Sequence, residues 1–272
     1  MADSQNDPSL AVFCDFENIA LGVQEAKYEK FDIHKVLERL LVKGSIVVKK
    51  AYCDWERYKS FKAPMHEASF ELIEIPHVRQ SGKNSADIRM VVDALDLCYT
   101  KAHVNTFVII SGDSDFSPLV SKLRENAKRV IGVGVKNSTS DLLVANCDEF
   151  IFYDDLVRGE KKRRARRKTT EKPAAAGSPP APKSADDKRQ EAFDHVMETI
   201  EALIAERGAG EKIWGSMVKQ ALKRRQPQFN ESYYGFGSFN KLLEEAEDKR
   251  LIELASDEKS GGYLITAVNH DE

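Results

Sequence analysis

Short apolar runs alternate with longer amphipathic segments over the first 157 residues. The apolar runs predict six strands, at residues 10–15, 46–55, 70–78, 106–113, 129–135 and 149–154. The segments between them have helical periodicity and predict helices at 31–44, 58–69, 86–101, 115–127 and 140–147. Because the strands are apolar throughout, both faces of the sheet should be covered. We therefore expect an α/β fold, a mostly parallel sheet sandwiched by helices.

The pattern changes after residue 189. Residues 191–208 predict an amphipathic helix that ends at Gly208 and Gly210, and residues 213–229 predict a shorter helix broken at Pro227. Residues 232–250 predict a third helix, and residues 251–267 predict two short strands around a Ser-Gly-Gly turn. Three helices and a β-hairpin are typical of a small winged-helix (α+β) domain.

The segment between these two patterns is unlike either of them. Residues 169–188 are rich in Pro, Ala, Gly and Ser and carry too little apolar surface to order themselves. We expect a domain at residues 1–157, a flexible linker at 158–188 and a second domain at 189–268.

Charge is distributed unevenly. The whole chain has a formal net charge of −3, whereas residues 158–168 hold eight basic residues and one acidic residue, so the rest of the chain has −10. Such a block is typical of a solvated tail or a nuclear-type address, or it is a flexible arm that binds phosphates. In the last case the contacts would include Lys161, Lys162, Arg163 and Arg164.

Several classes of protein are disfavoured. The sequence has no apolar run of about 18 residues, and its first residues lack the features of a secretory signal, so we expect a soluble, cytoplasmic protein that does not enter membranes. The four cysteines have no CxxC spacing, which favours reduced core thiols over a zinc site.

Acidic residues follow the predicted strands at one edge of the sheet. Asp15 ends the first strand, Asp113 and Asp115 follow the fourth, and Asp87 begins a helix. Asn18 can point its amide at the same place. Crowded carboxylates either have raised pKa values or are neutralised by a cation, and oxygen ligands favour Mg²⁺ or Mn²⁺. Such a site suits phosphodiester hydrolysis.

Each of these residues also has a simpler interpretation. Asp15 could cap the following helix, and Asp87 could be a favourable acid in a first helical turn. Asp93 lies six residues after Asp87, on another helix face, and its spacing from Arg89 equally suits an ion pair. Lys83 could contact the scissile phosphate or be an ordinary loop lysine.

Three segments together resemble the NYN domain, a LabA-like branch of the PIN-like nucleases. They are DFEN at 15–18, the run from Lys83 to Asp93, and SGDSDF at 111–116, and the resemblance covers about residues 8–157. It implies a metal-dependent ribonuclease in which Asp15, Asp87, Asp113 and Asp115 form the metal and catalytic site. By the same resemblance Asn18 lies beside them, and Asp93 is a less secure member. Some PIN-like domains bind RNA without cutting it.

The sequence at residues 215–246 resembles the OST-HTH or LOTUS domain, over roughly 190–268, through its Pro-x-Phe and Tyr-Gly-Phe-x-x-Phe motifs. That resemblance implies binding to RNA or to a protein partner. Four aromatic residues should belong to the core, and a basic strip on one helix is the candidate RNA contact. The aromatic residues are Tyr233, Tyr234, Phe236 and Phe239, and the strip is Lys219, Lys223, Arg224 and Arg225.

The combined interpretation is a Mg²⁺- or Mn²⁺-dependent endoribonuclease acting on single-stranded RNA, with a LOTUS domain that recruits RNA or a partner. One alternative is a non-catalytic RNA-binding adaptor with a structural or vestigial metal site. Another is an assembly factor in which the LOTUS domain grips a protein. No residue of this sequence is recognisable as one that reads a 2′-hydroxyl, so DNA cleavage stays open, as does the oligomeric state.

Overall fold

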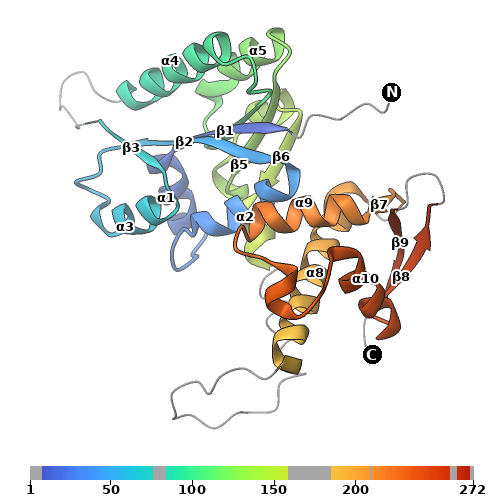
Figure 1. Cartoon of the computed structure of the whole chain (residues 1–272). Helices are drawn as coiled ribbons and strands as arrows, with labels where there is room; N and C mark the ends of the chain where they lie inside the picture. The colour runs from blue at the N-terminus through green and yellow to red at the C-terminus, as the bar shows by residue number, and fades with distance from the viewer. Residues whose placement is uncertain (1–7, 76–83, 159–184, 209, 258–261, 270–272) are drawn as a thin grey trace, which may run out of the picture. The chain divides into compact units, whose positions relative to one another are not determined.

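The computed structural model describes residues 8–75, 84–158, 185–208, 210–257 and 262–269 (Figure 1). The chain divides into two compact units. The first unit comprises residues 1–37 and 44–172, and the second comprises residues 38–43 and 173–272. None of the described helices is both long enough and apolar enough to span a membrane.

The first unit is built on a six-stranded parallel sheet with the order β3-β2-β1-β4-β5-β6. All six predicted strands are present, which confirms the predicted parallel sheet. Their bounds are Ser9–Asp15 (β1), Ser45–Cys53 (β2), Glu71–Glu74 (β3), Thr106–Ile110 (β4), Arg129–Gly134 (β5) and Glu149–Phe152 (β6).

Helices cover both faces of this sheet. In Figure 1, α4 and α5 lie on one face and α1 lies on the other. The helices include Phe16–Glu25 (α1), Ile33–Lys43 (α2), Lys59–Glu67 (α3), Ser85–Thr100 (α4), Ser117–Glu125 (α5) and Asp141–Asn146 (α6), with short 3₁₀ turns at Ser114–Phe116 and Lys136–Ser138. The last six residues of α2, 38–43, belong to the second unit.

The strand order reverses direction at the centre of the sheet. From β1 the chain builds outward through β2 to β3, and it then returns to place β4 on the other side of β1. In open α/β sheets the ligand site lies beyond the carboxyl ends of the strands at such a reversal. The ends of β1 and β4 are therefore where a site is expected.

Side chains that alternate along the central strands form the core under α4 and α5. Phe13 of β1 and Phe107 of β4 stack with their ring centroids 6.0 Å apart, and both are fully buried. Met90 and Ala94 of α4 pack into the same cluster. This packing fixes α4, and with it Asp87 in its first turn, against the two strands that carry the other acids.

From residue 185 onward, the described part of the second unit has three helices and a three-stranded antiparallel sheet with the order β7-β9-β8. The elements are Ala185–Arg207 (α8), Ile213–Trp214 (β7), Gly215–Arg225 (α9), a 3₁₀ turn at Glu231–Tyr234, Phe239–Asp248 (α10), Ile252–Ser256 (β8) and Tyr263–Val268 (β9). Strand β7 differs from the prediction, which placed residues 213–214 in a helix. They pair with Ile265 and Leu264 instead, which local periodicity does not encode.

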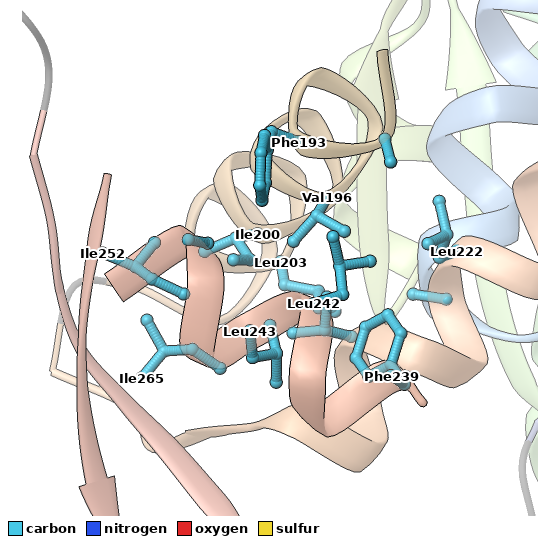
Figure 2. Close-up of a cluster of buried hydrophobic side chains, with 14 of the residues drawn as sticks. Phe193, Val196, Ile200, Leu203, Leu222, Phe239, Leu242, Leu243, Ile252 and Ile265 are labelled. Carbon is cyan, nitrogen blue, oxygen red and sulfur yellow. The ribbon is translucent and has the colours of Figure 1, made fainter. Parts of the chain in front are cut away.

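The core of the second unit lies between its helices and its sheet (Figure 2). Phe236 and Phe239 are buried in it and Tyr234 packs against it, as predicted. The prediction for Tyr233 was wrong, because this side chain is 60% exposed. The 3₁₀ turn that carries both tyrosines points only one of them inward, and Lys188 lies over the ring of Tyr233.

We expect Phe107→Ala to destabilise the first unit by about 3–5 kcal/mol, because it removes a fully buried ring and leaves a cavity under α4. The measurement is chemical denaturation followed by tryptophan fluorescence in a protein that also carries Trp214→Phe. The buried Trp55 is then the only tryptophan, so the signal reports the unfolding of the first unit. Tyr99→Ala, at a 65% exposed position of α4, should change the free energy of unfolding by less than about 0.5 kcal/mol. Equal effects of the two substitutions would contradict the assigned core.

Candidate metal site and nucleic-acid contacts

Asp15 lies at the junction of β1 and α1 and is 8% exposed. Its carboxylate caps α1 by accepting a hydrogen bond from the Asn18 N–H at 3.3 Å. The other oxygen accepts a hydrogen bond from the Ser111 hydroxyl, just beyond β4, at 3.0 Å. The capping interpretation of Asp15 is therefore correct, and it does not compete with a functional one, because the same carboxylate also faces the end of β4.

The loop after β4 is held rigidly against α1 and α6. The Gly112 N–H donates to the Asn18 side-chain oxygen at 2.8 Å, and the Gly112 carbonyl accepts from the Ser140 N–H at 2.9 Å. A Cβ at residue 112 would lie 2.4 Å from the Ser138 carbonyl oxygen, so only glycine fits here. Asn18 thus holds the backbone of the loop that carries Asp113 and Asp115, which we call the acidic loop.

The two carboxylates of this loop are held in different ways. The Asp113 carboxylate accepts a hydrogen bond from the Asp115 N–H at 2.9 Å, and the Asp113 N–H donates to Ser111 at 3.2 Å. Asp115 is exposed, whereas Asp113 is partly buried. The loop therefore presents one fixed acid and one exposed acid beside Asp15.

Asp87 lies near the loop acids, because it lines the same cleft as Asp115. Burial raises the pKa of the half-buried Asp87 carboxyl above its ordinary value of 3.8, and repulsion from Asp113, Asp115 and Glu17 raises it further. Three separate segments thus place carboxylates close enough to repel one another.

Asp15 has a more strongly raised pKa than Asp87. Burial is the main cause that raises the pKa of Asp15 from 3.8 to about 7, and repulsion from Asp87 and Asp113 adds to it. The hydrogen bonds from Asn18 and Ser111 oppose this increase without cancelling it. At neutral pH, Asp15 is therefore poised between its protonated and ionised forms.

The donor chemistry of this cluster fits a hard divalent cation. Its side chains offer carboxylate oxygens, which Mg²⁺ and Mn²⁺ prefer. Among the described residues, none of the four acids makes an ion pair with a lysine, arginine or histidine. Within the same residues, no three acidic, histidine or cysteine side chains are already arranged as a complete ligand set. The cluster therefore has the charge and the chemistry for a cation, whereas its side chains are not drawn together.

Asp93 lies in a different setting from the cluster. Its carboxylate accepts hydrogen bonds from the Tyr52 hydroxyl at 2.9 Å and from Lys50 at 3.3 Å, and Arg89 contacts it at 3.1 Å. The side chain is 12% exposed. The structure thus shows the ion pair with Arg89 that the spacing allowed, and it adds two partners from β2.

The basic residues predicted to contact RNA lie partly outside the described residues and partly in the second unit. Lys83 and the linker residues Lys161, Lys162, Arg163 and Arg164 lie outside the described residues. In the second unit, Lys219 pairs with Glu231 at 3.1 Å. Arg224 donates to the carbonyl of Leu41, a residue of the same unit, at 2.9 Å, whereas Lys223 is exposed.

Two residues near the cluster were missed by sequence reasoning. Ser111 orients the Asp15 carboxylate, and its only sequence signal is that it directly follows a strand and precedes the Gly-Asp pair. Glu17 lies in the first turn of α1, acts on Asp87 electrostatically, and is paired with Arg57 at 2.9 Å. The partner of Glu17 comes from 40 residues away, which no local pattern encodes.

Comparison with known proteins extends this picture. The family model of the NYN domain matches residues 9–154. An uncharacterised protein of Methanocaldococcus jannaschii is 30% identical over 112 residues, which cover 41% of this chain and 43% of that protein. The chain therefore spans less than half the length of this curated relative. The crystal structure of a protein of unknown function from Vibrio parahaemolyticus is similar with a TM-score of 0.50 and 26% identity, covering 56% of this chain and 97% of that one.

The raised pKa of Asp15 predicts how the free energy of unfolding depends on pH. Unfolded, this carboxyl ionises near pH 3.8, whereas in the fold it holds its proton up to about pH 7. The native state thus binds more protons than the unfolded state between these values, and the wild type loses stability as pH rises through this window. We expect Asp15→Asn, which keeps the helix cap, to stabilise the metal-free protein by about 2–4 kcal/mol at pH 8 and hardly at all at pH 4.

Chemical denaturation in EDTA between pH 4 and pH 8, followed by Trp55 fluorescence in the Trp214→Phe protein, measures the difference in the free energy of unfolding between Asp15→Asn and wild type. Asp93→Asn is the matched control, and it should have the opposite sign at neutral pH because it removes a carboxylate from Lys50 and Arg89. An Asp15→Asn protein that is less stable than wild type at pH 8 would show that the carboxylates do not repel one another as described.

Proposed function

Because the chain belongs to the NYN domain family, a branch of the PIN-like nuclease superfamily, we propose that it is a cytoplasmic, metal-dependent endoribonuclease that cuts single-stranded RNA. The observation that carries this proposal is the convergence of Asp15, Asp87, Asp113 and Asp115 where the strand order reverses. A cluster of uncompensated carboxylates is costly to maintain. Its cost is explained if a cation binds there during function.

In this proposal the four aspartates hold Mg²⁺ or Mn²⁺. When bound, the ion supplies Lewis-acid chemistry, because it stabilises charge on the phosphoryl oxygens and lowers the pKa of water. Asp15 and Asp113 come from the rigid ends of β1 and β4, whereas Asp115 is exposed at the edge of the cluster. The more exposed acid is the one best able to turn toward an arriving ion.

The surrounding residues orient these acids. The Ser111 hydroxyl fixes one oxygen of Asp15, and Asn18 fixes the backbone of the acidic loop through Gly112. Asp87 comes from α4 and not from the loop that carries Asp113 and Asp115, and in this proposal its carboxylate completes the metal site or orients the attacking water. Because Asp15 is partly protonated near pH 7, ion binding should release a proton from it.

We further propose that the second unit, as a LOTUS domain, recruits RNA or a protein partner to the first. Lys223 is exposed on α9 and is the member of the predicted strip best placed to meet a phosphate, because Lys219 and Arg224 already have partners. The basic block at residues 158–168 would hold RNA near the first unit and raise its local concentration. Binding that depends on this block should weaken steeply with salt.

The test is cleavage of end-labelled single-stranded RNA and matched DNA in Mg²⁺, Mn²⁺ or EDTA. We expect cleavage in metal only, and a loss of at least about a hundredfold in Asp15→Asn and Asp113→Asn, because each removes a proposed ligand. Asp96→Asn removes the same charge from an exposed position of α4 and should retain full activity. Cleavage by both Asp15→Asn and Asp113→Asn at the wild-type rate would contradict the proposed centre. RNA binding by the wild type without any cleavage would favour the adaptor function.

A further inference from the structure

A cleft of about 730 Å³ adjoins the carboxylate cluster between α4, α5 and the start of α6. Asp87 and Asp115 belong to both the cleft and the cluster. Whatever occupies the cleft therefore lies directly beside the proposed reaction centre. The volume is within the range of sites that bind small molecules, and it can hold a nucleoside.

The walls of the cleft are apolar and face each other from different helices. Ile88 and Val92 of α4 are 63% and 55% exposed, and Leu142 of α6 is 57% exposed. Pro118 of α5 adds an apolar surface. These are three of the most exposed large apolar side chains described, and all three line the same cleft, which suits a flat apolar group inserted between them.

Neutral polar groups complete the lining. Ser114, Ser121 and Asn84 contribute side chains, and Asn84 begins α4 without using its amide as a cap. Ser117 is 7% exposed, and its hydroxyl has no hydrogen-bond partner within the described part of the chain. A buried hydroxyl without a partner is costly, and a ligand would remove that cost if the Ser117 side chain turned its hydroxyl into the cleft that it lines.

The lining favours a base over the other candidates. The described residues that line the cleft include no lysine or arginine, so it does not suit a phosphate. In a symmetric dimer through this face, Asp87 and Asp115 of one copy would approach the same acids of the other, which repel. An unstacked base offers flat apolar faces to the walls and polar edges to the serines and Asn84.

We propose that this cleft binds one unstacked nucleobase of the RNA strand, at the nucleotide next to the phosphate that lies at the carboxylates. This inference rests on the proposed function, since it names how the same centre holds its substrate. It also accounts for a preference for single strands, because a base in a duplex cannot leave its stack at low cost. The apolar walls would then place the strand, while the acids act on its backbone.

Binding and cleavage of short single-stranded RNAs test the proposal, with a single abasic ribose moved one position at a time along the strand. The full-length Asp113→Asn protein is used because it should bind RNA without cutting it, and in it we expect one abasic position to weaken affinity roughly 5- to 100-fold. Ile88→Ala combined with Val92→Ala should weaken binding of intact RNA by a similar factor and abasic RNA hardly further. Val47→Ala, at an exposed site on the amino-terminal half of β2, is the matched control.

Ser117→Ala separates recognition from folding. It removes a partnerless hydroxyl, so the thermal midpoint should be unchanged or higher, while affinity for intact RNA falls and affinity for the abasic strand does not. If no abasic position matters, or if the wall variants weaken both strands equally, the base-binding proposal is wrong even when wild-type protein cleaves RNA. If base-dependent binding is seen but the wild type never cleaves, the base-binding site stands and the nuclease proposal fails.

Discussion

The hydrogen bonds that join the end of β1 to the end of β4 determine the geometry of the whole candidate centre. Ser111 reaches Asp15, and Asn18 reaches the backbone of Gly112, so two segments almost a hundred residues apart become one rigid edge. The stacked rings of Phe13 and Phe107 lie beneath them and keep the two strands in register. The positions of Asp15 and of the loop acids depend on this junction, whereas the packing of α4 positions Asp87.

That junction holds the carboxylates in a state that is unfavourable for the protein alone. Asp15 is buried and is repelled by Asp87 and Asp113, and its hydrogen bonds do not compensate fully. Proteins retain such arrangements where function requires them, because stability and activity make opposite demands on the same residues. The unpaired hydroxyl of Ser117 and the exposed apolar walls of the adjoining cleft follow the same principle. In the proposed function, a bound cation would offset the repulsion among the carboxylates, and a bound base would cover the apolar walls of the cleft.

The second unit has basic side chains that are partly paired. Its helices and sheet enclose one core, and several of its basic side chains are used within the unit itself. Lys219 and Arg224 would have been counted as free nucleic-acid contacts from their spacing on a helix. Both side chains have partners within the unit, whereas Lys223 and Tyr233 are exposed and Lys188 lies over the Tyr233 ring.

The sequence alone determined the elements of the first unit and the identity of its acids, since both follow from local patterns. Apolar runs predict strands, and parallel strands bring Asp15 and Asp113 to one edge whatever the detailed packing. Only the tertiary structure decided where the remaining side chains point. Asp93 faces Tyr52 and Lys50 of β2, residues 213–214 pair with β9, Tyr233 points outward, and the cleft forms from three separate helices. Each of these depends on partners distant in sequence, and local periodicity carries no information about which distant residue a side chain will meet.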